Sequence, residues 1–313
     1  MKTNPSTTPT LSILIPVFRY NCRQLVETLS KEARELNIPY EIILGDDCSG
    51  KDWKEIYDKW TKEIANLLIY HSHENLGAGK MRNRLVEQAK WDTILLLDSD
   101  VLPQSDSFIK DYLSSLEPNA VVCGGFVYNP NDVTPDRLLR YEYGIRIESQ
   151  SAQERAKDPY KSFIAMSMLT TRQVFDVVCY PPEMGMGYED ARFGHILKLA
   201  EVPIIHIDNP VIHQLKETSE QFLATTRRYV DNLYRHRVTL KSSEIKLLDT
   251  FNKMKRMRIT PILRVGWKLF HSSMERHLCG RKPSMTVFSA YKLLYISSLH
   301  RVEKPTITQN KQT

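Results

Sequence analysis

The sequence of 313 residues lacks the features that would place a chain in a membrane or in an oxidising compartment. No apolar run reaches the 18 or so residues of a membrane span. The early run LSILIPVF is too short for a signal peptide and has the wrong flanking residues. The five cysteines are widely separated and form no C-x-x-C pair, which argues against a disulfide framework and a zinc knuckle. We therefore expect a cytoplasmic protein.

Acidic residues are scarce in one segment only. Residues 241–304 contain 14 Lys and Arg against 4 Asp and Glu, whereas the whole chain has a net charge of +6, so the first 240 residues are net acidic. In this segment the basic residues alternate with aromatic and aliphatic ones at helical spacing, which is typical of a helix on an anionic membrane surface. Helices that pack on the rest of the chain are the alternative. Because no nucleic-acid-binding motif is present, we expect no nucleic-acid partner.

Residues 11–97 alternate between strand-like and helix-like segments. Four apolar runs predict buried strands, namely LSILIPVF, YEIILGDD, LLIYHS and TILLL. Apolar residues at a 3.6-residue spacing predict helices at 22–36, about 52–65 and about 79–90. This alternation predicts an α/β fold with a doubly wound, mostly parallel sheet flanked by helices. Ligands bind beyond the carboxyl ends of the strands in such sheets, so the residues after the strands should share one pocket.

The alternation of strand-like and helix-like segments is less regular after residue 120. VVCGGFVY suggests a strand, residues 130–160 are polar and partly helical in pattern, and FIAMSMLTTRQVF suggests a strand that enters a helix. A Gly- and Pro-rich loop, YPPEMGMG, precedes the helical pattern of YEDARFGHILKLA. VPIIHIDNPVIHQL should hold the last strands of the sheet.

Two aspartates follow the apolar strand in the segment TILLLDSDVLP. Buried carboxylates are costly unless a cation or strong hydrogen-bond donors meet them. Mg²⁺ is usually held by one or two carboxylates together with a substrate's phosphates. Asp98 and Asp100 are one residue apart and can both face the same cleft. A solvated loop with a helix-capping Asp is the alternative interpretation of this D-x-D pattern.

Together these segments resemble the family 2 glycosyltransferases, which are inverting, nucleotide-sugar-dependent enzymes of the GT-A fold. The resemblance covers roughly residues 11–215 and rests on six segments in the family's order: LSILIPVF, IILGDDCSG, NLGAGKMRN, LLLDSD, GYED and the late His213. We accordingly predict a GT-A domain at 11–220 and a basic helical extension at 221–304. The ends, 1–10 and 305–313, should be disordered.

The resemblance implies a nucleotide-sugar site at the first strand ends. Pro16 and the backbone around Phe18 would line the base pocket, and Asp47 would accept a hydrogen bond from a uracil N–H, which points to a UDP donor. Asp46 would fix the loop or the ribose, although both acids could instead cap the next helix. The other residues implied are Asn75, Gly77, Lys80, Arg82, Asp98 and Ser99. Lys80 or Arg82 could face the diphosphate, or both could be solvated surface charges.

The resemblance also implies a metal and a catalytic base. Asp98, Asp100 and His213 would hold Mg²⁺ or Mn²⁺, although His213 could simply be a hydrogen-bonded residue. Inverting transfer needs a base for the acceptor hydroxyl and an electrophile for the departing diphosphate, and the metal would be that electrophile. Asp190 in GYED would be the base and Glu189 would hold the acceptor. The preference of helix starts for acids is the alternative explanation of this pair.

We therefore expect a metal-dependent inverting glycosyltransferase, peripheral on the inner face of the cell membrane. It would move a hexosyl or N-acetylhexosaminyl group from a UDP-linked donor to a glycan or lipid-linked acceptor in surface polysaccharide or glycoconjugate synthesis. A nucleotidyltransferase is less favoured, because the turn PVFRYNC after the first strand has no glycine. An inactive sugar-nucleotide-binding protein is less favoured, because the D-x-D and GYED acids are present. The chain also lacks the Q-x-x-R-W signature of processive polymerases.

Overall fold

The computed structural model describes residues 8–182, 187–240 and 245–300. Of the predicted disordered ends, residues 1–7 and 305–313 lie outside the described residues. Parts of the predicted Gly- and Pro-rich loop and of the basic segment at 241–304 also lie outside them, at 183–186, 241–244 and 301–304.

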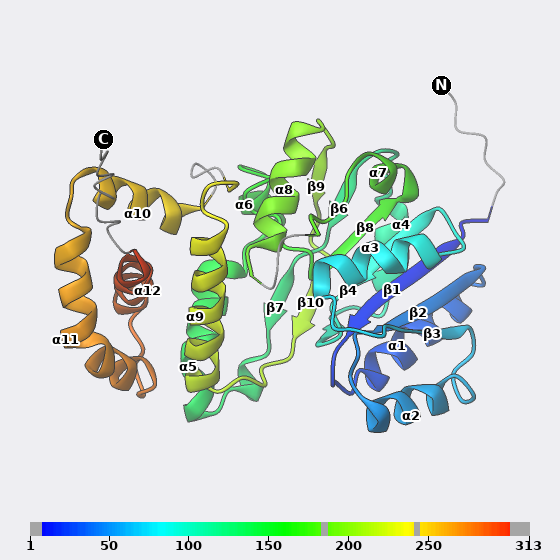
Figure 1. The fold of residues 1–313 in the computed structure, drawn as a ribbon. Coiled ribbons are helices and arrows are strands. Elements are labelled where there is room, and N and C mark those ends of the chain that lie inside the picture. The colour runs from blue at the N-terminus through cyan, green and yellow to red at the C-terminus, as the bar shows by residue number, and fades with distance from the viewer. Residues whose placement is uncertain (1–7, 183–186, 241–244, 301–313) are drawn as a thin grey trace, which may run out of the picture.

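The centre of the fold is a seven-stranded sheet (Figure 1). In spatial order its strands are β3 (Leu67–His71), β2 (Tyr40–Asp46), β1 (Leu11–Val17), β4 (Thr93–Leu97), β8 (Ser167–Thr171), β6 (Val121–Cys123) and β9 (Ile204–His206). β8 runs antiparallel to both of its neighbours, and the other pairings are parallel. The predicted α/β fold with a mostly parallel sheet is therefore confirmed.

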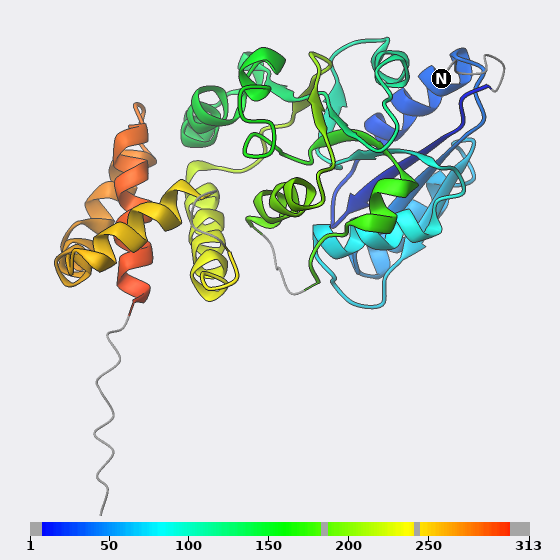
Figure 2. The same cartoon turned by 90° about the horizontal axis from the view of Figure 1, so that it is seen from above.

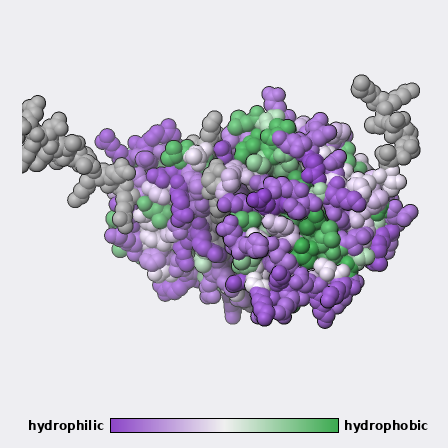
Figure 3. Space-filling model, turned by 45° about the vertical axis from the view of Figure 1, so that its right-hand side comes forward, coloured by the Kyte–Doolittle hydropathy of each residue, from purple (hydrophilic) through white to green (hydrophobic). Residues whose placement is uncertain are grey.

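Helices cover both faces of this sheet. Strands such as β1 and β2 are therefore buried along their whole length. One face carries α1 (Arg23–Glu35), α2 (Lys51–Trp60) and α4 (Phe108–Ser114), and the other carries α3 (Ala78–Gln88), α7 (Arg172–Val177) and α8 (Glu189–Leu199). Alternate residues of β1 join the two cores: Ile13 packs with α1 and Leu14 packs with α3. Figure 2 shows the sheet between these layers. The face seen in Figure 3 is mostly hydrophilic, with hydrophobic patches near its middle.

The three helices predicted before residue 97 are present. α1 and α3 match the predicted ranges within two residues. α2 ends at Trp60 and not near residue 65, because the residues before β3 form turns and Asn66 has a φ of +60°. A turn with a left-handed residue reverses the chain more tightly than a helix allows.

The segment VVCGGFVY forms two strands and not the single predicted one. β6 ends at Cys123, and β7 (Phe126–Tyr128) belongs to another sheet. The two glycines make the break between them: Gly125 has a φ of +82°, and a Cβ on Gly124 would clash with the carbonyl oxygen of Asn209.

The second sheet has three strands in the order β5 (Val101–Pro103), β10 (Val211–His213) and β7. β10 pairs antiparallel with β5, and His213 lies opposite Val101. Since β5 begins directly after the D-x-D acids, this register brings His213 to Asp100. The second sheet therefore closes one end of the predicted pocket.

Residues 130–160 are partly helical, as predicted. Their elements are two 3₁₀ turns (Pro130–Asp132 and Pro135–Arg137), α5 (Leu138–Tyr143), a π-helical turn (Gly144–Glu148) and α6 (Ala152–Arg155). α5 packs against the helices that follow the sheets. This segment therefore joins the sheets to the C-terminal part of the chain.

Within the described ranges, four helices follow the sheets: α9 (Ser219–Arg235), α10 (Lys246–Arg256), α11 (Thr260–Leu278) and α12 (Met285–Leu299). α9 begins with a capping box of Thr218 and Gln221 and packs against α5 and α12. In Figures 1 and 2 it lies between the sheets and the other three helices. The helices predicted in 221–304 are thus present, and the domain boundary after residue 220 stays a prediction. None of the helices in the described part of the chain is long and apolar enough to cross a membrane.

Candidate functional site

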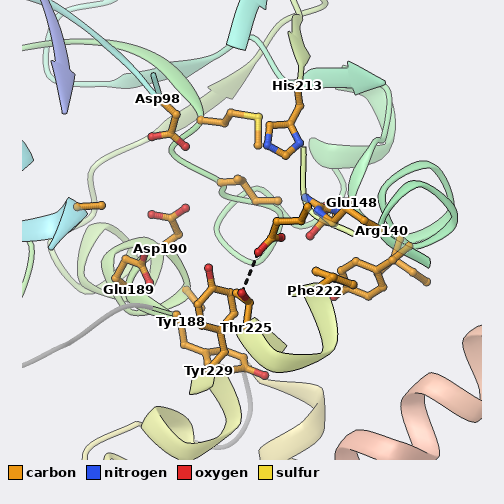
Figure 4. Close-up of a pocket in the computed structure, with 18 of the residues that line it drawn as sticks. Asp98, Arg140, Glu148, Tyr188, Glu189, Asp190, His213, Phe222, Thr225 and Tyr229 are labelled. Atoms are coloured by element: carbon orange, nitrogen blue, oxygen red, sulfur yellow. Dashed lines mark hydrogen bonds and ion pairs between the residues drawn. The ribbon is translucent and has the colours of Figure 1, made fainter. Parts of the chain in front are cut away.

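One large cavity, of about 1550 Å³, opens where β1, β2 and β4 end, the place that this topology predicts for a ligand. We call its two walls the sheet side, lined by Asp47, Asp98, Asp100, Glu189 and Asp190, and the helix side, lined by Arg140, Glu148, Phe222, Thr225 and residues of α12. Figure 4 shows Asp98, Glu189 and Asp190 facing Arg140, Glu148 and Phe222 across the cavity. Acids from distant parts of the chain therefore share one space.

Asp47 follows β2 and holds the loop that begins α3. Its carboxylate accepts hydrogen bonds from the backbone N–H groups of Leu76 at 2.6 Å and Gly77 at 2.8 Å. Gly77, which has a φ of +80°, is the residue before α3. Burial raises the pKa of Asp47, although the two hydrogen bonds act against the increase. Asp47, Asn75 and Gly77, all predicted to bind the nucleotide sugar, line the cavity, as do Pro16 and Phe18.

Asp46, in contrast, is not among the residues that line the cavity. Its carboxylate accepts a hydrogen bond from the backbone N–H of Ser49 at 3.0 Å and lies 2.8 Å from His71 Nδ1. These contacts fix the loop after β2, which is one of the two roles predicted for Asp46. Neither Asp46 nor Asp47 caps α2, because that helix begins after Gly50 without a side-chain cap.

Lys80 does not line the cavity either, although it was a predicted diphosphate contact. The α3 residues that reach the cavity are Ala78 and Arg82, which are four residues apart and share a helix face. Lys80 is two residues from each of them, roughly 200° around the helix. Its side chain therefore leaves α3 on the other face.

Arg82 links two of the acids on the sheet side. Its guanidinium is 3% exposed, and it lies 2.6 Å from Asp98 Oδ1 and 3.3 Å from Asp190 Oδ1. The ring of Tyr180 lies against it, 5.2 Å from centroid to guanidinium carbon. Burial raises the pKa of Asp98, while Arg82 acts in the opposite direction. Arg82 is thus not the solvated surface charge of the alternative prediction.

Asp100 and His213 form a second polar pair on this side. Asp100 Oδ2 lies 3.2 Å from His213 Nε2. Burial disfavours the Asp100 carboxylate, but the hydrogen bond and the charge of His213 outweigh burial, so the pKa of Asp100 is lowered. His213 Nδ1 is buried and has no hydrogen-bond partner among the described residues. The ring packs edge-on against Tyr128.

These groups fit a divalent cation as part of a shared coordination shell. No group of three or more His, Cys, Asp or Glu side chains in the described ranges is arranged to hold a metal ion by itself. Mg²⁺ needs fewer ligands from the protein, since one or two carboxylates together with the substrate's phosphates are enough. Such ligands can come from Asp100, from the second oxygen of Asp98 and from His213. All three residues line the cavity together with Ser99.

The two acids at the start of α8 follow Tyr188, which has a left-handed φ of +67°. Asp190 Oδ2 accepts a hydrogen bond from the backbone N–H of Ala165 at 3.1 Å, and no side chain caps the helix. Burial, together with the charge of Asp190, raises the pKa of Glu189 to about 7. Glu189 therefore changes its charge near neutral pH.

Gly187, which lies two residues before α8, packs against α9. Gly187 has a φ of +92°, and a Cβ there would lie 2.5 Å from the ring of Tyr229. The side-chain amide of Asn232 donates a hydrogen bond to the Gly187 carbonyl oxygen at 3.0 Å. α9 thus positions the residues that lead into Glu189 and Asp190 at the start of α8.

The helix side was not predicted from the sequence. Arg140 of α5 pairs with Glu148 at 2.8 Å, and the Tyr128 hydroxyl donates to the same carboxylate at 2.8 Å. Phe222 of α9 and Phe288 of α12 add aromatic rings. The sequence signal that bears on the helix side is the spacing of aromatic residues in the basic segment at 241–304. This spacing indicates buried helix faces but does not indicate a cavity.

Known proteins resemble parts of this chain. TuaG of Bacillus subtilis, assigned to teichuronic acid biosynthesis, is 28% identical over 147 residues, which are 42% of this chain and 58% of TuaG. The poly(ribitol-phosphate) β-glucosyltransferase of Bacillus spizizenii is 30% identical over 132 residues, which are 41% of this chain and 19% of that protein. The chain therefore spans less than two thirds of the length of either relative.

A solved structure supports the fold over nearly the whole chain. The mannosyltransferase PcManGT from Pyrobaculum calidifontis, in complex with GDP-Man and Mn²⁺, has a TM-score of 0.55 and 13% identity, covering 95% of this chain and 87% of its own. At this identity the likeness shows the fold alone, and the predicted GT-A fold is confirmed.

The sequence profile of glycosyl transferase family 2 matches residues 12–177, more than half of the chain. This range runs from β1 to α7 and includes Asp47, Arg82, Asp98 and Asp100. The same residues build most of the sheet side. On the profile match and the fold together, the chain belongs to glycosyl transferase family 2.

Proposed function

We propose that the protein is an inverting glycosyltransferase that moves a sugar, hexosyl or N-acetylhexosaminyl, from a nucleotide-sugar donor to a hydroxyl group of a glycan or lipid-linked acceptor. The proposal rests mainly on one observation: the acids after β2, after β4 and at the start of α8 line one cavity of about 1550 Å³. Such a space has room for a donor and an acceptor together. The names of TuaG and the poly(ribitol-phosphate) β-glucosyltransferase support a role in surface polysaccharide synthesis.

The donor would lie at the strand ends of the sheet side. Phe18 is 45% exposed beside Pro16 and offers a face on which a base can stack. Each oxygen of the Asp47 carboxylate accepts one backbone hydrogen bond and keeps a second lone pair. A base N–H can use that lone pair, and uracil has one such N–H. We favour UDP, and GDP is the competitor because guanine also presents N–H groups.

Asp98, Asp100 and His213 would hold Mg²⁺ or Mn²⁺ together with the donor's diphosphate. The bound cation would stabilise the negative charge of the diphosphate as it leaves. The Mn²⁺ in the PcManGT complex supports a metal of this kind. Arg82 keeps Asp98 in a fixed orientation, so the chain itself prepares this end of the cavity.

Asp190 would be the catalytic base. The contacts with Arg82 and with the backbone N–H of Ala165 hold its carboxylate in place at the cavity wall. In the reaction the acceptor oxygen forms a bond to the anomeric carbon while the bond from that carbon to the diphosphate breaks, and the hydroxyl proton passes to Asp190. Glu189 would hold the acceptor by hydrogen bonds.

The exposed side of α11 supports peripheral membrane association. Ile262, Val265 and Leu269 are 55% to 70% exposed, and their spacing of three and four residues puts them on one helix face, which we call the α11 face. Exposed cations occur near it in sequence: Lys253, Lys255, Arg256, Arg258, Lys268, Arg276, Arg281 and Lys282. None of these cations pairs with an acid in the part of the chain that the structure describes. An apolar stripe with unpaired cations suits an anionic membrane, where a lipid-linked acceptor would lie.

The donor proposal is tested by calorimetric titration of the full chain with UDP and with GDP, with and without Mn²⁺. We expect UDP to bind more tightly than GDP and to require Mn²⁺. Asp47→Asn should weaken UDP binding about tenfold, because the amide can accept hydrogen bonds at only one of its two terminal atoms. Asp52→Asn, at an exposed acid of α2, is the matched control. Unchanged UDP affinity in Asp47→Asn would remove this residue from the donor site.

A further inference from the structure

The helix side of the cavity contains a lysine without an acidic partner. Lys292 lies on α12 and lines the cavity. Its ammonium is 4.5 Å from the ring centroid of Phe288 and 4.9 Å from that of Tyr143. No ion pair or hydrogen bond joins it to another described residue. Burial lowers the pKa of Lys292 to about 8. A recessed ammonium of this kind is costly unless a bound anion compensates its charge.

Glu148, the acid whose charge acts on Lys292, is already neutralised. The Glu148 carboxylate pairs with Arg140 at 2.8 Å and accepts a hydrogen bond from the Tyr128 hydroxyl at 2.8 Å. The three charged groups Arg140, Glu148 and Lys292 therefore leave one net positive charge on this wall.

Two more cations line the cavity on the helix side. Arg228 of α9 donates a hydrogen bond to Thr225 Oγ1 at 2.9 Å and pairs with no described acid, and Lys246 of α10 lines the cavity in the same unpaired state. Glu217 is the other acid here, and it accepts a hydrogen bond from the Thr225 hydroxyl at 2.8 Å. Cations thus outnumber acids on the helix side, with Arg140, Arg228, Lys246 and Lys292 against Glu148 and Glu217. The five carboxylates of the sheet side, in contrast, outnumber the other cations that line the cavity, Arg82, Lys161 and Lys216.

We propose that Lys292 and its aromatic neighbours form an acceptor subsite for a negatively charged group, either a phosphate or a carboxylate. The inference rests on the proposed function and deepens it, because it names the charge of the acceptor. An anionic acceptor is repelled by the acids of the sheet side and attracted to the cations of the helix side, so the charge pattern orients it. The rings of Tyr143, Phe288 and Phe222, which contact one another, can take the apolar face of a sugar or polyol.

The probes are two matched pairs of small molecules. Ribitol 5-phosphate and ribitol differ by a phosphate, and glucuronate and glucose differ by a carboxylate. Each is titrated calorimetrically into the full chain saturated with UDP and Mg²⁺, so that no probe anion can enter the diphosphate position. We expect at least one anion to bind tenfold or more tightly than its neutral partner, as charge-assisted hydrogen bonds predict. The pair that shows the preference identifies phosphate or carboxylate as the group recognised.

Lys292→Met keeps the aliphatic stem and removes the charge, so it should abolish the preference for the anion. Lys292→Arg should retain it. Lys62→Met, at an exposed lysine after α2 that does not line the cavity, is the matched control and should bind like the wild type. If Lys292→Met does not fold, Lys292→Gln replaces it. The melting temperature of the Met variant should equal or exceed that of the wild type, because an uncompensated charge has been removed from a recessed position.

The proposal is overturned if neither anion binds more tightly than its neutral partner in the wild type, or if Lys292→Met keeps the preference. The first result would leave Lys292 as a structural residue held by cation–π contacts alone. Failure of UDP to bind is a separate outcome that counts against the proposed donor. In that case the same four probes are titrated into the unliganded chain, and Lys292→Met still decides the anion subsite.

Discussion

The two sides of the cavity are held together by different interactions. On the sheet side, charged contacts between side chains far apart in sequence fix the acids, as in the pairs of Arg82 with Asp98 and Asp190. On the helix side, one ion pair of neighbouring segments, Arg140 with Glu148, is accompanied by ring contacts such as Tyr143 with Phe222 and Phe288. Charged networks keep a single geometry, whereas packed rings accept substitution more readily. If the sheet side carries the chemistry of transfer and the helix side binds the acceptor, as we propose, the two properties can be changed separately.

The largest expected effect lies on the sheet side. Asp190→Asn keeps the contacts with Arg82 and Ala165 but cannot take a proton, so transfer should fall by roughly 10² to 10⁴, the usual contribution of a general base. Calorimetry should show unchanged donor affinity. Asp176→Asn, at an exposed acid of α7, is the control. Near-normal transfer with a lower melting temperature would make Asp190 structural, and Glu189 would become the candidate base.

The next effect tests whether the sheet side depends on its charged network. Arg82→Met leaves Asp98 and Asp190 without their shared cation, and breaking a buried pair costs about 3–5 kcal/mol of unfolding free energy. Transfer should also fall, because both acids lose their orientation. Arg84→Met removes an exposed Arg on the same helix that pairs with Glu87, and it should change stability little. Equal urea midpoints for the two variants would contradict the network.

A pH experiment sharpens the same comparison through Glu189. Its pKa of about 7 in the folded protein exceeds the ordinary value of 4.5, so the folded state holds this proton more tightly than the unfolded chain. Stability is therefore lost as the pH rises from about 4.5 to 7 and the carboxyl ionises. Glu189→Gln should be more stable than the wild type at pH 8, by up to about 3 kcal/mol. At pH 4 the two should be equal, and a difference of the same size at both pH values would exclude ionisation as the cause.

The smallest effect on chemistry is expected at the α11 face. The double variant Ile262→Asp, Leu269→Asp should lower sedimentation with vesicles that contain phosphatidylglycerol about tenfold or more, because it places charge on the apolar stripe. UDP affinity should stay within about twofold of the wild type, since the α11 face lies outside the cavity. Val238→Asp, at an exposed residue after α9, is the control. Equal sedimentation of wild type and double variant would remove the membrane proposal.

The sheet side could be predicted because its signals are local. An apolar strand followed at once by acids marks Asp47, Asp98 and Asp100, and parallel topology brings such strand ends together. Lys80 shows the limit of that reasoning. The NLGAGKMRN motif predicted that Lys80 contacts the donor, but Lys80 lies on the face of α3 that points away from the cavity.

The helix side could not be predicted, because it depends on packing between distant segments. Lys292 follows Asp98 by almost two hundred residues, and it reaches the cavity because α12 packs against α9 and Phe288 contacts Tyr143 of α5. The spacing of the aromatic residues indicated helices and could not show which face each would bury. The break in VVCGGFVY was missed for a similar reason, because Asn209, which excludes a side chain at Gly124, lies far along the chain.

The contact between α9 and Gly187 limits how relatives could exchange parts. A hybrid enzyme that took all of its C-terminal helices from another family member would place a foreign side chain where Tyr229 supports the left-handed Gly187. The residues that lead into Glu189 and Asp190 would then lose the surface that supports them. A crossover after α9 keeps Tyr229 and Asn232 with the loop they hold and replaces only α10, α11 and α12. On the roles that we propose for the two sides, acceptor preference is therefore the property that natural recombination or engineering can graft onto this chain without changing the contacts that hold Gly187.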